Sequence, residues 1–151
     1  MEQTEASAYR GLELLKEGKA IAIVPQGCSM QPFIKGGEDT VHLMKLEKVE
    51  VGDIVLVNYY GKYLLHRVYA VDGEWVTTMG DGNLKGVERF RKEEALGTVV
   101  EIVHKGRCRK PSKGWLWRKL LPVRWLPLKV YRKWNKWRNS LKNKQQKDNK
   151  I

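Results

Sequence analysis

The chain has 151 residues, which is enough for one domain of ordinary size and too few for two comfortable ones. Apolar residues make up 42% and charged residues 30%, a composition that excludes a bundle of membrane-spanning helices and argues against a wholly disordered chain. The formal net charge of +12 is unevenly distributed: residues 1–103 carry 12 Lys and Arg against 16 Asp and Glu, whereas residues 104–151 carry 17 against the single Asp148. The sequence therefore predicts a near-neutral domain followed by a strongly basic tail.

The amino-terminal segment, residues 1–19, predicts one amphipathic helix over residues 5–17. Leu12 and Leu15 fall on one side of this helix, and Gly18 supplies a stop signal. The first residues are polar and acidic, without a basic region followed by an apolar one, so we expect no secretion signal. No apolar run reaches the length of about 18 residues that a spanning helix needs. We therefore expect a location in the cytoplasm or at a membrane surface.

Two cysteines, Cys28 and Cys108, are too few for a disulfide framework and lack the spacing of a zinc site. This usage favours a reducing compartment. Neither a metal nor an organic cofactor is implied by the sequence.

From residue 20 the chain changes to short β-branched runs separated by turn residues. Gly61 and the pair Asp72-Gly73 separate neighbouring runs in the manner of hairpin turns. The sequence thus predicts a mainly β core over residues 20–103. Its expected strands cover residues 20–24, 40–44, 53–60, 62–71, 74–79 and 97–103.

The predicted tail, residues 104–151, opens with a stretch that has the composition of a linker. Five of the six tryptophans then follow within residues 115–137, interleaved with Lys and Arg, and Pro122 and Pro127 predict a division into short helical pieces. The last piece has an apolar stripe at helical spacing, formed by Val130, Trp134, Trp137 and Leu141.

Such a tail suits an anionic membrane surface, where aromatic rings lie at the headgroup boundary and cations meet anionic lipid. The candidate membrane-binding residues are Trp134, Trp137, Arg132 and Lys133. Nucleic acid is the rival partner for so basic a segment, and packing on the chain's own domain or on a protein partner is the third alternative. The apolar stripe favours the membrane, because a phosphate binder needs no apolar face.

Three residues could supply the parts of a serine hydrolase. Ser29 lies in a turn just after a strand, His66 within a strand, and Asp81 in a glycine-rich turn. A serine hydroxyl needs a base to take its proton, imidazole suits that task, and a carboxylate can fix the tautomer of the imidazole. Each residue also has a structural interpretation, since Ser and Asp in turns commonly cap backbone groups and a strand His is commonly structural.

Five short motifs strengthen the catalytic interpretation, and they occur in one order: GCSMQPFI at 27–34, DTV at 39–41, VGDIV at 51–55, HRV at 66–68 and GDGN at 80–83. In this order they resemble the signal peptidase and LexA-like serine peptidases, over residues 20–103. The resemblance implies a coiled β fold and a serine endopeptidase that cuts an extended peptide, leader or protein substrate. It further implies that Ser29 is the nucleophile, His66 the general base and Asp81 the orienting acid. The histidine resembles the endoplasmic-reticulum and archaeal branch, because the bacterial housekeeping branch uses lysine.

The resemblance also places Met30 and Pro32 at the substrate cleft and Gly27 at the oxyanion, with Cys28 expected as a small buried neighbour. Some family members have a second Asp shortly after the glycine-rich turn, and this chain has only Glu88 in that stretch. Two alternatives stay open: a LexA-like regulatory domain that cleaves only itself, and a non-enzymatic binding module with a membrane- or nucleic-acid-binding tail.

Overall fold

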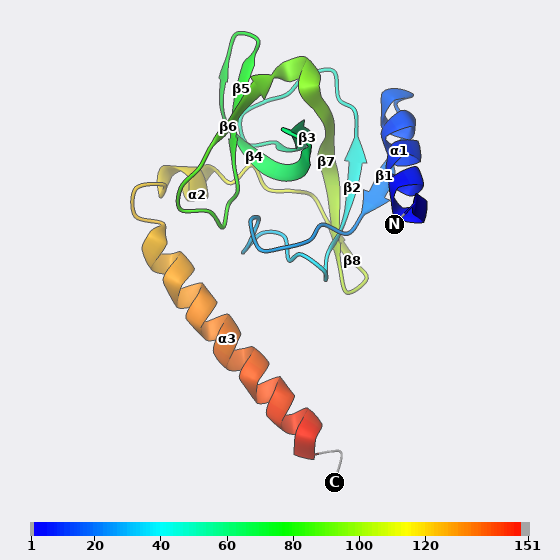
Figure 1. Cartoon of the computed structure of the whole chain (residues 1–151). Helices are drawn as coiled ribbons and strands as arrows, with labels where there is room; N and C mark the ends of the chain where they lie inside the picture. Colours follow the sequence, from blue (N-terminus) through cyan, green and yellow to red (C-terminus); the bar gives the residue numbers. More distant parts are fainter. Residues whose placement is uncertain (1, 149–151) are drawn as a thin grey trace. The chain divides into compact units, whose positions relative to one another are not determined.

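The computed structural model describes residues 2–148, which divide into two compact units, Met1–Trp115 and Leu116–Ile151 (Figure 1). In the first unit, helix α1 (Glu2–Lys16) precedes a sheet in which all pairs are antiparallel. The strands run in the order β1-β2-β7-β3-β4-β5-β6, and β8 pairs with β7. Their bounds are β1 Ile21–Ile23, β2 Thr40–Met44, β3 Ile54–Tyr59, β4 Lys62–Asp72, β5 Trp75–Met79, β6 Glu88–Arg91, β7 Ala95–His104 and β8 Arg107–Arg109.

The prediction of a mainly β core behind one helix is confirmed. Side chains of the sheet gather in two apolar clusters. One contains Ile54, Leu65 and Ile102, and the other contains Val55, Val68 and Phe90. The centre of β4 is buried without interruption from Leu65 to Val68, because both faces of the strand are covered.

Helix α1 packs on the first cluster through Leu15, which is almost fully buried. A Cβ atom built on Gly97 of β7 would lie 3.2 Å from the Leu15 side chain, so the absence of a side chain at Gly97 lets the helix approach the sheet closely. The helix ends where Gly18 adopts a φ of +77°, as the sequence predicts.

Both predicted hairpin turns are present. β3 and β4 are joined at Tyr60 and Gly61, both with positive φ, and β4 and β5 at Gly73. Strand β6 was not predicted, because its four residues ERFR contain a single apolar side chain. Strand β8 lies in the stretch expected to be a linker. The first unit therefore extends to Trp115 rather than ending near Val103.

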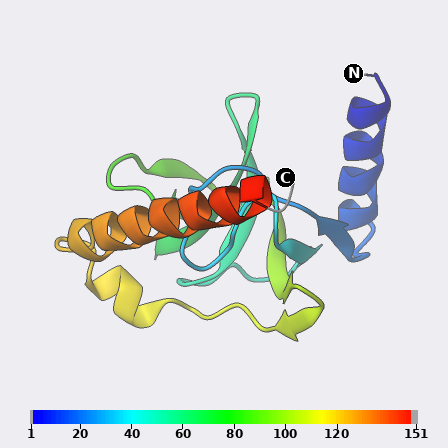
Figure 2. The same ribbon diagram turned by 90° about the horizontal axis from the view of Figure 1, so that it is seen from below.

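The second unit contains α2 (Trp115–Lys119, beginning at the junction) and the long helix α3 (Trp125–Asp148), seen along its length in Figure 2. Pro122 separates the two helices, as predicted. Pro127 does not interrupt α3, because it is the third residue of the helix, where the missing N–H would have no helical partner. Among residues 2–148 no helix has both the length and the apolar character needed to cross a membrane.

Candidate functional site

Ser29 lies in a loop between β1 and β2 that closes on itself. The amide of Gly37 donates to the carbonyl of Pro25 at 2.8 Å, and the amide of Ile34 donates to Met30 at 2.9 Å. Gly27 has a φ of +83°, and a Cβ built on Gly36 would lie 2.1 Å from the carbonyl oxygen of Gly27. Only glycine fits at position 36, so the loop holds Ser29 in one tightly closed conformation.

The Ser29 loop rests on the turn GDGN at 80–83. The amide of Gly82 donates to the carbonyl oxygen of Ser29 at 2.7 Å. A Cβ built on Gly80 would lie 2.5 Å from that same oxygen, and one built on Gly82 would lie 2.5 Å from the carbonyl of Cys28. Both glycines are therefore required by the close approach of two backbone segments.

A fully buried ion pair fixes this turn to β4. Both Asp81 and Arg67 are 0% exposed, and Nε of Arg67 donates to the two carboxylate oxygens at 2.8 and 2.9 Å, while Nη2 donates at 2.7 Å. Nη1 donates to the carbonyls of Gly52 at 2.9 Å and Ser112 at 2.6 Å. The guanidinium also lies 5.0 Å from the centre of the Phe33 ring, so it joins the Ser29 loop, the turn and β4.

The carboxylate that meets His66 is Glu88, from β6. Nδ1 of His66 lies 2.8 Å from Oε2 of Glu88, and both side chains are nearly buried. The hydroxyl of Thr78 donates to the same oxygen at 2.9 Å. The sequence predicted that Asp81 would orient His66, but both oxygens of Asp81 accept from Arg67 and the structure gives the Nδ1 contact to Glu88.

A carboxylate such as Glu88 accepts a hydrogen bond, so in neutral His66 the proton is assigned to Nδ1. The other ring nitrogen, Nε2, is then the one that can accept a proton. Within residues 2–148 no hydrogen bond joins the Ser29 hydroxyl to His66. Contacts between a nucleophile and its base are commonly long in the absence of substrate and shorten when substrate binds. Ser29 and His66 are linked through the backbone, since Met79, which leads into the GDGN turn, pairs with Arg67 next to His66.

A cavity of about 310 Å³ opens beside Ser29. Its walls are largely apolar, and they include Leu65, the neighbour of His66 in β4. Met30, expected at the substrate cleft, and Gly27, expected at the oxyanion, both line this cavity, and Met30 is nearly buried. The other lining residues are Ile23, Pro25, Gln26, Ile34, Gly36, Leu56, Tyr63 and Leu64.

Two of the expected site residues, Pro32 and Cys28, do not line this cavity. Pro32, which follows a cis peptide bond, lines a different depression with Arg107 and Cys108. Cys28 was expected to be buried and is exposed, and its backbone carbonyl lies close to Gly82.

The segment after β8 continues across Arg67. The carbonyl of Ser112 accepts a hydrogen bond from Arg67. Gly114 also packs on Arg67, so closely that a Cβ built on it would lie 2.9 Å from the guanidinium carbon. Lys113 donates to Asp53 at 2.6 Å and to Glu50 at 3.3 Å. The hydrogen bond to Asp53 raises the pKa of Lys113 above its ordinary value of 10.5, because the contact favours the charged ammonium. Residues 112–114, predicted as part of a linker, are therefore a strap that caps the buried ion pair.

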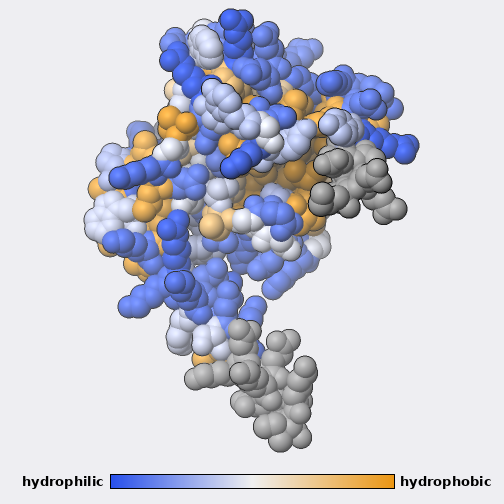
Figure 3. All heavy atoms as spheres, viewed as in Figure 1, coloured by the Kyte–Doolittle hydropathy of each residue, from blue (hydrophilic) through white to orange (hydrophobic). Residues whose placement is uncertain are grey.

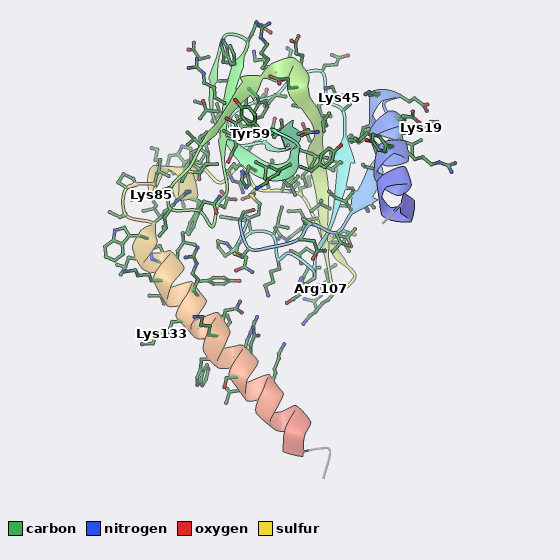
Figure 4. All side chains as sticks on the ribbon, viewed as in Figure 1. Lys19, Lys45, Tyr59, Lys85, Arg107 and Lys133 are labelled. Atoms are coloured by element: carbon green, nitrogen blue, oxygen red, sulfur yellow. The ribbon has the colours of Figure 1, made fainter. Side chains whose placement is uncertain are left out.

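The four candidate membrane-binding residues all lie on α3, in the second unit. Trp134 and Trp137 are 48% and 61% exposed, and Arg132 and Lys133 are exposed; Lys133 is labelled in Figure 4.

Glu88 is the site residue that sequence reasoning did not identify as the partner of His66. Strand β6 alternates buried and exposed residues, with Glu88 and Phe90 inward and Arg89 and Arg91 outward. An inward glutamate in a four-residue strand could have been found only by recognising that strand. Comparison with known protein families and with curated protein sequences gave no match to this chain.

Proposed function

We propose that the chain is a serine endopeptidase with a signal-peptidase-like coiled β fold, in which Ser29 is the nucleophile, His66 the general base and Glu88 the residue that orients the base. The observation that carries the proposal is the hydrogen bond between Nδ1 of His66 and a buried carboxylate. Such a contact selects the tautomer with a basic Nε2 and stabilises the imidazolium that forms during catalysis. The order of the sequence motifs around Ser29 and His66 supports the same assignment.

In the proposed reaction the hydroxyl oxygen of Ser29 attacks the carbonyl carbon of the scissile peptide bond while its proton passes to Nε2 of His66. Collapse of the tetrahedral intermediate breaks the carbon–nitrogen bond, and His66 returns the proton to the leaving amine. Water then hydrolyses the acyl-enzyme with His66 again acting as base. Because position 27 is glycine, backbone N–H groups of the Ser29 loop are the candidate donors to the oxyanion.

The cavity beside Ser29 suits a small or medium apolar side chain of an extended substrate. Its walls come from Met30, Leu56 and Leu65, and no charged residue is among its lining residues in the part of the chain that the structure describes. The proposed substrate is therefore a peptide with an apolar residue close to the bond that is cut.

A fluorophosphonate probe followed by peptide mass spectrometry tests this proposal. The native chain should be labelled at Ser29, and Ser29→Ala and His66→Ala should each abolish labelling. Ser140→Ala, a change of an exposed serine on α3, and Cys28→Ala, next to the nucleophile, serve as matched controls and should be labelled like the native chain. Undiminished labelling of Ser29→Ala would overturn the proposal. If the same mass spectrometry finds peptide-bond cleavage only within the chain itself, the LexA-like, self-cleaving alternative is assigned.

A further inference from the structure

The described part of the second unit exposes many large apolar side chains. Large hydrophobic side chains are 41–67% exposed over its first eleven residues and 42–62% along α3. Figure 3 shows hydrophobic residues among basic ones on the surface over α2 and the start of α3. Contiguous apolar patches of this kind mark interaction sites. The exposed residues are Leu116, Leu120, Leu121, Val123, Trp125 and Leu126, followed by Val130, Trp134, Trp137 and Leu141.

On α3 five of the exposed apolar residues share one face. Leu126, Val130, Trp134, Trp137 and Leu141 follow one another at intervals of four, four, three and four residues, which keeps them in one stripe along a helix of 3.6 residues per turn. The stripe continues the apolar turn that precedes the helix.

Cations on α3 lie against exposed tryptophan rings, one in the stripe and one at the start of the helix. Nζ of Lys129 lies 5.0 Å from the centre of the Trp125 ring, and the guanidinium of Arg138 lies 4.8 Å from the Trp134 ring. The second unit as a whole has 12 Lys and Arg against one Asp, whereas the first unit is close to neutral, with 17 against 16. Nearly all of the net positive charge therefore belongs to the unit that carries the apolar stripe.

Four backbone amides of the turn between α2 and α3 have partners within the segment. The amides of Leu120, Leu121, Val123 and Leu126 donate to carbonyls within the same segment at 2.9–3.2 Å. A turn can enter the apolar boundary of a bilayer at low cost only when its amides have such partners.

From these observations we infer that the second unit is an interfacial membrane anchor. The turn Leu120–Leu126 inserts its apolar side chains at the boundary between headgroups and acyl chains, and α3 lies flat with its cations on anionic headgroups. An exposed apolar stripe on a strongly cationic unit matches that boundary, whereas a nucleic acid would need the cations alone and a second copy would bring like charges together. This inference does not rest on the proposed peptidase activity.

Co-sedimentation of the full chain with vesicles tests the inference. Binding should be strong to vesicles containing phosphatidylserine and at least tenfold weaker to pure phosphatidylcholine, because each cation near an anionic surface contributes about fivefold in affinity. Raising salt from about 0.1 to 1 M shortens the screening length from about 10 to about 3 Å, so most of the electrostatic part should disappear while a fraction of the binding resists salt.

Matched variants separate the two contributions. Val123→Asp should remove the salt-resistant fraction, whereas Val87→Asp, the same change at an exposed position of the first unit, should leave binding unchanged. Lys133→Gln with Lys136→Gln should weaken the salt-sensitive part by an order of magnitude or more. The tryptophan emission of the native chain should shift to the blue on anionic vesicles, a readout that requires no substitution.

Several outcomes would overturn the inference: equal binding to neutral vesicles, no emission shift, loss of binding in Val87→Asp, or tighter binding to duplex DNA or RNA than to anionic vesicles. Concentration-dependent dimerisation blocked by Val123→Asp, without vesicle binding, would assign the stripe to a second copy of the chain. Ser29→Ala should bind vesicles like the native chain, so a failure of the peptidase proposal and a failure of the anchor proposal are distinguishable.

Discussion

Nδ1 of His66 lies 2.8 Å from Oε2 of Glu88, and this one contact joins β4 to β6, the edge strand two places along the sheet order. Thr78 of β5, the strand between them, donates to the same oxygen. The proposed base is therefore oriented by a residue 22 positions further along the chain, held in place by strand pairing.

Glu88→Gln should lower kcat by about 100-fold or more with little change in KM, because the amide keeps the size of the side chain but no longer stabilises the imidazolium. Steady-state assays on a cleaved peptide measure both constants. Thr78→Val keeps the His66–Glu88 contact and should lower kcat less than Glu88→Gln does. An unchanged kcat in Glu88→Gln would show that Glu88 has no part in the mechanism.

The pH dependence of the native chain should identify the base. Neutral imidazole accepts the serine proton, so kcat/KM should rise with pH and become level before about pH 9, where a lysine base would still be gaining activity. A profile that climbs steeply above that pH would argue against His66 as the base.

Asp81→Asn should chiefly affect stability. Removing one partner of a fully buried pair leaves the Arg67 guanidinium without its counter-charge, and the free energy of unfolding should fall by about 3–5 kcal/mol. Urea denaturation measures the loss. Glu93→Gln removes the exposed ion pair between Glu93 and Arg91, whose charged groups are 3.9 Å apart. It should lower the free energy of unfolding by less than about 1 kcal/mol. The activity of folded Asp81→Asn should exceed that of Ser29→Ala; equal, complete loss would indicate a catalytic role for Asp81.

Gly82→Ala should inactivate the chain without unfolding the sheet. The added Cβ would lie 2.5 Å from the carbonyl oxygen of Cys28 and 3.1 Å from that of Gln31, so the Ser29 loop would have to move. Probe labelling at Ser29 and thermal denaturation measure the two properties. Gly11→Ala, in α1, adds a Cβ at an ordinary 3.6 Å from Ile21 and should retain labelling while stabilising the helix by about 0.5–1 kcal/mol. Full labelling of Gly82→Ala would show that the loop does not need this close approach.

Lys113→Met tests the strap at residues 112–114. Because the hydrogen bond to Asp53 raises the pKa of Lys113 above 10.5, its stabilisation is complete below that pH and is lost as the pH rises through the folded-state value. The difference in unfolding free energy between native chain and variant should be below about 1 kcal/mol, since the ammonium is half exposed, and should shrink above pH 10.5. Lys62→Met, at an exposed position of β4, should show no such shrinkage. A difference that grows with pH would contradict the role given to Asp53.

Local patterns were sufficient for the elements whose signals lie within a few residues. Gly61 and Gly73 mark the two hairpins because glycine adopts positive φ at no steric cost. The helical spacing of Leu12 and Leu15 likewise predicted α1 and the face that packs on the sheet. The motifs around Ser29 and His66 singled out these residues, and charge counting separated a near-neutral unit from a basic one.

Only the tertiary structure decided which carboxylate meets which cation. The family resemblance assigned Asp81 rather than Glu88 to His66, but register places Met79 opposite Arg67 and Thr78 opposite Glu88, which brings Asp81 to the guanidinium and Glu88 to the imidazole. Likewise, residues 112–114 have the composition of a linker and become a strap only because Arg67 and Asp53 present partners to them. Propensity and periodicity act over a few residues, whereas these pairings depend on contacts between segments distant in the chain, which no local pattern contains.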